Sequence, residues 1–372
     1  MIEHKQRSSN LDVIRIFAFL CVVSVHFFRK TEFYDNGIYG IVVIIPITIR
    51  NCAMVCVPLF MMLSGYLLKN RTPTKKYYFK LFQTVGIYVL ASLACGAYSY
   101  ISNPGEFSLG EALWGILSFE TAPYSWYVEM YIGLFMLIPF LNKMYNSGSE
   151  KWKKGLLLTF LILTLLPSIL NIWRFAELSW WKRPSSSQDY MPLIPDQWEV
   201  LYPFTYYFIG AYLRDYPLKL KPLPTLGLLL GVIVVGNAFA FYRDFGQPLS
   251  SGRWINYQSV MITSQSVLVF HFLQNLNLSR LGNGSRKVLA KLSSWVLGAY
   301  LCSSIFDEYL YPILCAWEPS YVRRLIYFPL IVLAVAVLSM ALSAILNGVY
   351  NLCEKLVVKC CSRKSPETQQ NP

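Results

Sequence analysis

Two ionisable residues stand eleven positions apart in the first apolar stretch of the chain, LDVIRIFAFLCVVSVHFF. They are Arg15 and His26. Eleven residues of α-helix return to within about 20° of the same direction and rise about 16 Å, so one helix face would carry both side chains. Arginine is always charged, whereas imidazole is the usual general acid or base near neutral pH. We therefore predict that His26 is catalytic and that Arg15 binds substrate. The alternative is a snorkelling arginine and a structural histidine.

Two later acidic sites could complete this chemistry. Glu129 lies near the start of the stretch SWYVEMYIGLFMLIPFLN, at a depth similar to that of His26, and we predict that it orients the imidazole and stabilises its charged form. An interfacial glutamate that faces water is the alternative. Asp307 and Glu308 form a second candidate pair. Adjacent helical positions diverge by about 100°, so only one would face the same cavity, and we choose Asp307, as a substrate-binding residue.

The composition predicts that these residues lie in a membrane. The 372 residues are 55% apolar and only 14% charged, with a mean hydropathy of +0.41. A soluble domain carries about 25% charged residues, so the charge is too low for a water-exposed surface of this size. Disordered, collagen-like and disulfide-scaffold classes are excluded on the same grounds. The formal net charge of +13 is spread over short clusters between apolar runs, which argues against nucleic acid as a partner.

Apolar stretches long enough for transmembrane helices recur along the chain. We predict an all-α integral membrane protein, a bundle of about ten transmembrane helices. The expected spans are 12–29, 46–68, 77–101, 124–142, 154–174, 199–213, 224–242, 256–275, 293–316 and 325–352. The span 199–213 is the weakest because it has the fewest residues. The domain layout is a cytoplasmic N-terminus (1–11), one membrane domain (12–352) and a cytoplasmic tail (353–372).

The distribution of basic residues predicts the orientation. Ten spans place both termini on one side of the membrane. The loops and ends on that side carry 22 of the 33 lysines and arginines, against nine on the opposite side. Since cytoplasmic loops are enriched in these residues, both termini are expected in the cytoplasm. The first stretch ends in HFFRK without a small-residue cleavage pattern, so we expect a retained anchor.

Five sequence blocks, in order, resemble the membrane-bound acyltransferase family 3 over roughly residues 10–350. Arg15 and His26 match the Arg-x10-His signature at the start of the family domain. The other blocks are VPLFMMLSGYLL (57–68), YSWYVEMYIGLFMLIPFLN (124–142), YYFIGAYL (206–213) and LSSWVLGAYLCSSIFDEYLYPIL (292–314). The chain departs from the pattern at Tyr124 and at Cys302–Ser304, where many members have histidine. These departures leave no second histidine at either place.

The resemblance implies a chemistry for the site. Family members transfer an acyl group, usually acetyl, from acyl-CoA to a hydroxyl of a cell-envelope glycan. It therefore implies a multi-pass protein of a bacterial plasma membrane, acetyl-CoA as donor and no metal. His26 would act as general base or as a covalent acyl carrier. Acyl-CoA contacts are expected from Arg15, Arg50, Lys75 and Lys76, with Lys80 as a further basic contact.

A transporter or flippase of a glycan or lipid-linked substrate is the alternative function, because such proteins also carry polar residues at membrane depth. Transporters often consist of two related halves, and the sequence has no evident internal repeat. Turnover of radiolabelled acetyl-CoA by the purified protein separates the two classes.

The orientation can be tested with single cysteines in a chain that lacks its native ones. Cysteines at positions Ser149 and Ser285 should resist membrane-impermeant thiol reagents in intact cells, and one at Ser186 should react, because the loop charges place the first two inside. Inverted labelling would overturn the assignment.

Overall fold

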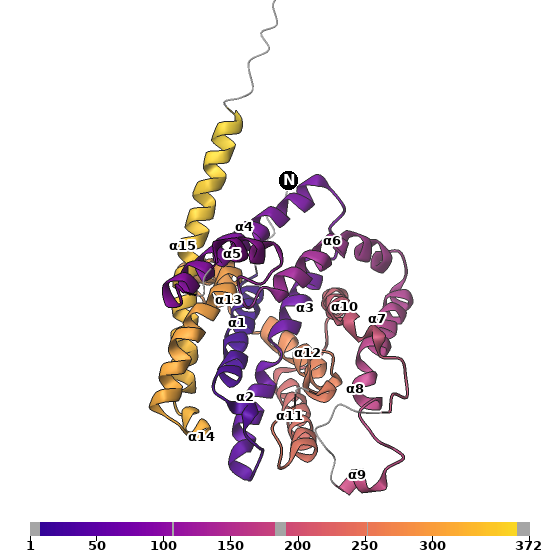
Figure 1. Ribbon diagram of the computed structural model, residues 1–372. Helices are drawn as coiled ribbons and strands as arrows, with labels where there is room; N and C mark the ends of the chain where they lie inside the picture. The colour runs from indigo at the N-terminus through magenta and orange to yellow at the C-terminus, as the bar shows by residue number, and fades with distance from the viewer. Residues whose placement is uncertain (1–7, 106–107, 183–190, 251, 363–372) are drawn as a thin grey trace, which may run out of the picture.

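The computed structural model describes residues 8–105, 108–182, 191–250 and 252–362, whose regular structure is helical (Figure 1). Within this part of the chain, β-pairing is limited to two isolated bridges, which join Gly37 to Pro248 and Ile38 to Phe245. The prediction of an all-α protein is confirmed. Ser186, the proposed labelling position, lies outside the described residues.

A helix occupies each of the ten predicted positions. The helices are α1 (Ser9–Lys30), α2 (Ile44–Ala53), α3 (Cys56–Leu68), α4 (Lys75–Ser102), α5 (Leu109–Leu117), α6 (Trp126–Asn146), α7 (Glu150–Leu165), α8 (Pro167–Leu170), α9 (Leu178–Lys182), α10 (Tyr202–Asp215), α11 (Pro222–Asp244), α12 (Val260–Gln274), α13 (Asn283–Trp317), α14 (Tyr321–Arg324) and α15 (Phe328–Ser362). Helices α2 and α3 share the second predicted span, and α7 and α8 share the fifth.

Seven helical segments among the described residues are long and apolar enough to cross a membrane. They are α1, α2 with α3, α4, α7 with α8, α11, α13 and α15. The 14 residues of α10 and the 15 of α12 reach only about 21–23 Å, short of the roughly 30 Å hydrocarbon core. Helix α6 has 21 residues but includes Glu129, Asn142 and Lys143. A multi-pass membrane protein is supported, while the ten-span layout stays a prediction.

Helix α1 lies at the centre of the bundle and packs against α3, α12, α13 and α15. Both of its ends are fastened: Asn10 donates hydrogen bonds to the carbonyl oxygens of Leu273 and Leu276, and Arg324 donates to that of Thr31 at 2.8 Å. Because α1 is held at both ends, it can neither slide along its axis nor rotate freely. The side chains on its buried face therefore keep both their depth in the bundle and the direction in which they point.

Helices α1 and α13 run parallel. Arg15 on α1 meets Ser293 on α13, and eleven residues later His26 meets Asp307. The two contacts occur in the same order along both helices, which fixes their relative register. Two residues far apart in sequence, His26 and Asp307, are thereby brought to the same depth.

Two glycines let α3 and α10 touch through their backbones. A Cβ atom added to Gly65 would collide with the carbonyl oxygen of Tyr207, and one added to Gly210 would collide with that of Met62. Small residues at such crossings let membrane helices approach closely. Helix α3, which lines the cavity described below, is therefore set against α10 without intervening side chains.

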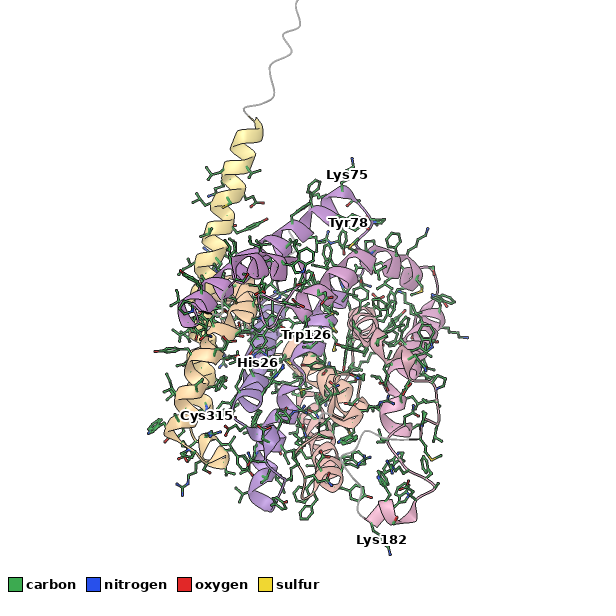
Figure 2. All side chains as sticks on the ribbon, viewed as in Figure 1. His26, Lys75, Tyr78, Trp126, Lys182 and Cys315 are labelled. Atoms are coloured by element: carbon green, nitrogen blue, oxygen red, sulfur yellow. The ribbon has the colours of Figure 1, made fainter. Side chains whose placement is uncertain are left out.

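The two ends of the bundle can be told apart by their residues. We call the end with Lys75 and the C-terminal end of α15 the terminal face, and the end with Lys182 and Cys315 the distal face (Figure 2). The thiol of Cys315 contacts the carbonyl oxygen of Lys30 at 3.8 Å, so α1 ends near the distal face. His26 lies between the two faces.

Candidate active site

The imidazole of His26 is held by a buried carboxylate. Its Nδ1 lies 3.1 Å from Oδ2 of Asp307, whose side chain is fully buried. With Asp307 in its ionised form, which only accepts hydrogen bonds, Nδ1 is the donor and we assign the proton of a neutral ring to Nδ1. This leaves the lone pair on Nε2, which has no hydrogen-bond partner among the described residues. The side chain of His26 keeps 11% exposure. The geometry suits Nε2 for accepting a proton.

A tyrosine completes the arrangement, which we call the His26 cluster (His26, Tyr124 and Asp307). The Tyr124 hydroxyl donates to the same Oδ2 of Asp307 at 2.7 Å, and its ring centroid lies 3.9 Å from that of His26. The Tyr300 hydroxyl in turn donates to the backbone oxygen of Tyr124 at 2.5 Å. The cluster thus joins α1, α13 and the segment just before α6, and both the carboxylate and the ring have fixed orientations.

The carboxylate beside His26 is not the one that we expected. Glu129 is exposed on α6, next to the fully buried Val128, and lies outside the His26 cluster. The depth of Glu129 in the membrane could be estimated by counting residues from the membrane boundary. The rotation of α6 about its axis could not be, and it turns the Glu129 side chain away from the core. Asp307, our second choice and one that we had assigned to substrate binding, occupies the orienting position. Glu308 is exposed, as the divergence of adjacent helix positions requires.

Tyr124 was not among the predicted site residues. The sequence comparison marked it only as a departure, because many proteins with this pattern have histidine there. Its position directly before a Ser-Trp pair at the start of a span gave no further sign of a role. Its function in the cluster follows from packing alone.

Arg15 lines a partly open cavity, which we call the central cavity. The cavity has a volume of about 300 Å³, and α1, α3, α4, α6 and α13 enclose it, with lining residues that include Val22, Phe60, Ser64, Leu68, Thr84, Tyr131 and Val296. Nη1 of Arg15 lies 2.6 Å from Ser293 Oγ and 3.4 Å from Asp12 Oδ1. The arginine is therefore a fixed cation in an otherwise mainly apolar chamber.

The central cavity reaches the neighbourhood of the His26 cluster. Tyr127 and Tyr300 line it, and their ring centroids lie 5.8 Å apart. Tyr300 also bonds to Tyr124, and Val22, another lining residue, lies one helical turn before His26 on the same helix face. His26, Tyr124 and Asp307 do not line the central cavity themselves; Val22, Tyr127 and Tyr300 are the lining residues that connect it to the His26 cluster.

The predicted lysines are exposed at the terminal face. Lys75 and Lys76 open helix α4, whose first turn is capped by Thr74. A smaller pocket of about 140 Å³, which we call the basic pocket, includes Arg71, Lys76 and Lys80 among its lining residues. Lys75 is not one of the lining residues. Three cations around one pocket suit an anionic group such as a phosphate.

Arg50 lies apart from these groups. It is buried on α2, where Nε donates to the Tyr34 hydroxyl at 2.7 Å and Nη1 contacts the carbonyl oxygen of Ile255 at 3.2 Å. Its hydrogen bonds tie α2 to the segments that precede α2 and α12. The structure thus places Arg15 in the central cavity, eleven residues along α1 from His26, and holds Arg50 in a separate buried set of hydrogen bonds.

Comparison with known proteins gives one match. A family model described as an acyltransferase domain matches residues 8–348, which include the His26 cluster, the central cavity and the basic pocket. No curated protein and no solved structure matches the chain significantly.

The pairing of His26 can be tested without an activity assay. A double-mutant cycle on unfolding in mixed detergent micelles should give a coupling of about 1–3 kcal/mol between His26→Ala and Asp307→Ala, because each change removes a partner of one buried, charge-assisted hydrogen bond. The matched cycle between His26→Ala and Glu129→Ala should show no coupling beyond about 0.5 kcal/mol. Coupling to Glu129 instead of Asp307 would refute the arrangement.

Proposed function

The chain belongs to the acyltransferase 3 family and is an acyltransferase, and we propose that it moves an acetyl group from cytoplasmic acetyl-CoA to a hydroxyl of a cell-envelope glycan. One observation carries this proposal. A basic pocket, a mainly apolar cavity with one arginine, and a carboxylate-held histidine follow one another through the bundle. In our proposal these three sites bind the anionic phosphates, the uncharged pantetheine arm and the reactive thioester of an acyl-CoA, in that order.

The two cavities adjoin at α4 and at the end of α3. Thr84 lines the central cavity and Lys80, one turn earlier on the same helix, lines the basic pocket. Leu68 lines the former, and Asn70, two residues later, lines the latter. In our proposal the phosphates of CoA lie among Arg71, Lys76 and Lys80, and the pantetheine arm enters the central cavity past Arg15. The thioester then lies toward Tyr127 and Tyr300.

His26 would act as the general base. Its Nε2 takes the proton of the acceptor hydroxyl as that oxygen attacks the thioester carbonyl carbon. The carbon–sulfur bond then breaks, and the sulfur leaves and receives the proton from the imidazolium. The products are an ester and free CoA, and the imidazole returns neutral. A covalent acetyl-histidine is the alternative, which would appear as an acetylated His26 when acetyl-CoA is supplied without acceptor.

Asp307 and Tyr124 would be positioning residues. A carboxylate at Nδ1 keeps the ring in the tautomer whose Nε2 can accept a proton, and it stabilises the imidazolium formed during transfer. The Tyr124 hydroxyl shares the same oxygen and packs its ring against that of His26, which limits rotation of both groups. Neither residue needs to touch the substrate in this scheme.

We also propose the ten-span layout, in a bacterial plasma membrane with both termini in the cytoplasm. The basic pocket lies beside Lys75 at the terminal face, where cytoplasmic acetyl-CoA would arrive. The charge distribution of the loops supports the same orientation. Helices α6, α10 and α12 would complete the bundle, two of them as short helices among longer neighbours.

Steady-state acetyl transfer by the purified chain tests this function. His26→Ala should lower kcat at least about 100-fold, because general-base catalysis contributes 10²–10⁴-fold. Asp307→Asn should lower kcat at least about tenfold with little change in the KM for acetyl-CoA, since it disturbs the base and not the donor site. The measurement is the transfer of label from radioactive acetyl-CoA to added glycan.

Two variants serve as controls. Glu129→Gln should stay close to the wild-type rate, because this side chain lies outside the His26 cluster. Lys76→Ala should raise the KM for acetyl-CoA and leave kcat unchanged. The proposal fails if His26→Ala keeps more than about a tenth of the wild-type rate, or if labelled acetyl-CoA is not turned over at all.

A further inference from the structure

A second cavity, which we call the side cavity, is lined by Pro123, the residue directly before Tyr124. This side cavity has a volume of about 400 Å³ and lies between the end of α4, α5 and the segment that leads to α6. Pro123 lines it, and Tyr127 lines the central cavity. The segment 123–127, which carries Tyr124, thus contributes one lining residue to each cavity.

The lining of the side cavity differs from that of the central one. Ser99 and Asn103 contribute polar groups from α4, and Glu111, Glu120 and Thr121 contribute them from α5 and the following segment. None of its lining residues is basic. Carboxylate and amide oxygens accept hydrogen bonds from hydroxyl and ammonium groups, and the two carboxylates would repel an anion.

The segment beside this cavity is held in a constrained shape. Phe119 has a φ of 61°, which is unusual for a residue with a side chain, and its carbonyl oxygen accepts from the Ser125 hydroxyl. Thr121 donates from its hydroxyl to the carbonyl oxygen of Ala112 at 2.6 Å, and its backbone packs closely over Gly115. These contacts fix the shape of the segment that borders the side cavity.

Helix α5 fits the same interpretation. Trp114 and Leu117 are 68% and 71% exposed, so one side of α5 presents a large apolar surface, as in helices that lie in a membrane interface. Glu111 and Gly115, on the other hand, line the side cavity. The helix would therefore place a polar chamber at the boundary of the lipid phase, where a water-soluble or lipid-linked sugar can reach it.

We infer that the side cavity binds the acceptor, and that the acceptor is an uncharged or cationic polyhydroxylated glycan, not an anionic one. The inference rests on the proposed function for the role of the bound sugar. Donor and acceptor enter chambers on either side of Tyr124, and the acceptor hydroxyl reaches His26 past the tyrosine. Glu111 and Glu120 set the charge preference.

Binding of trisaccharides to the purified full-length chain, without acyl-CoA, tests this inference. The probes are neutral triacetylchitotriose, its cationic deacetylated form and anionic trigalacturonate, titrated by calorimetry. We expect the first two to bind and trigalacturonate not to bind. In the double variant Glu111→Lys/Glu120→Lys, the affinity for the cationic probe should fall at least about tenfold, and trigalacturonate should bind. Both glutamates are exposed, so the fold should be kept, and unchanged acetyl-CoA affinity verifies it.

The matched control is Glu150→Lys, an exposed glutamate at the start of α7, which should leave all three affinities unchanged. The inference is overturned if trigalacturonate binds best to the wild-type chain, if no trisaccharide binds, or if the double variant behaves like the control. If the wild-type chain turns over acetyl-CoA but the double variant binds all three saccharides as the wild type does, the side cavity is not the acceptor site and the proposed function still stands. If the saccharides bind as expected but acetyl-CoA is not turned over, the saccharide site stands and the proposed function fails.

Discussion

The buried carboxylate of Asp307 is the group on which the site depends. One of its oxygens receives hydrogen bonds from both the imidazole of His26 and the hydroxyl of Tyr124, while Oδ1 is buried without a hydrogen-bond partner among the described residues. A charge so enclosed costs several kcal/mol unless donors stay in place. The register of α1 against α13, fixed also by Arg15 and Ser293, keeps them there. The same packing of α1 against α13 that stabilises the buried carboxylate therefore also orients the imidazole of His26.

This constraint explains the placement of the remaining groups. A histidine held on its Nδ1 side offers only Nε2 to substrates, so the acceptor hydroxyl must approach that atom and the thioester carbonyl carbon must lie next to the hydroxyl oxygen. The segment that carries Tyr124 contributes Tyr127 to the central cavity, which also contains Arg15, and Pro123 to the side cavity, which also contains two carboxylates.

Much of the helix layout could be predicted from the sequence, because apolar length and charge measure depth in a membrane. The same reasoning placed Arg15 and His26 on one face of one helix. It chose Glu129 over Asp307 because depth along a helix can be counted, whereas rotation and the order of neighbours depend on packing. The hydrogen bonds of Arg50 to Tyr34 and to Ile255 could not be predicted for a similar reason, because both partners lie in other segments of the chain. Tyr124 gave no signal, since its role arises only when three segments meet.

The central claim is that the acyl group of a donor bound in the central cavity lies beside Nε2 of His26. Bromoacetyl-CoA tests it directly, because a nitrogen that meets the bound acyl group displaces bromide and keeps a covalent label. In a chain with its cysteines replaced, mass spectrometry should locate one carboxymethyl-type adduct on His26, formed at a rate that acetyl-CoA suppresses and that Asp307→Asn lowers. An adduct on another residue, or labelling of His26 that acetyl-CoA does not suppress, would contradict the account.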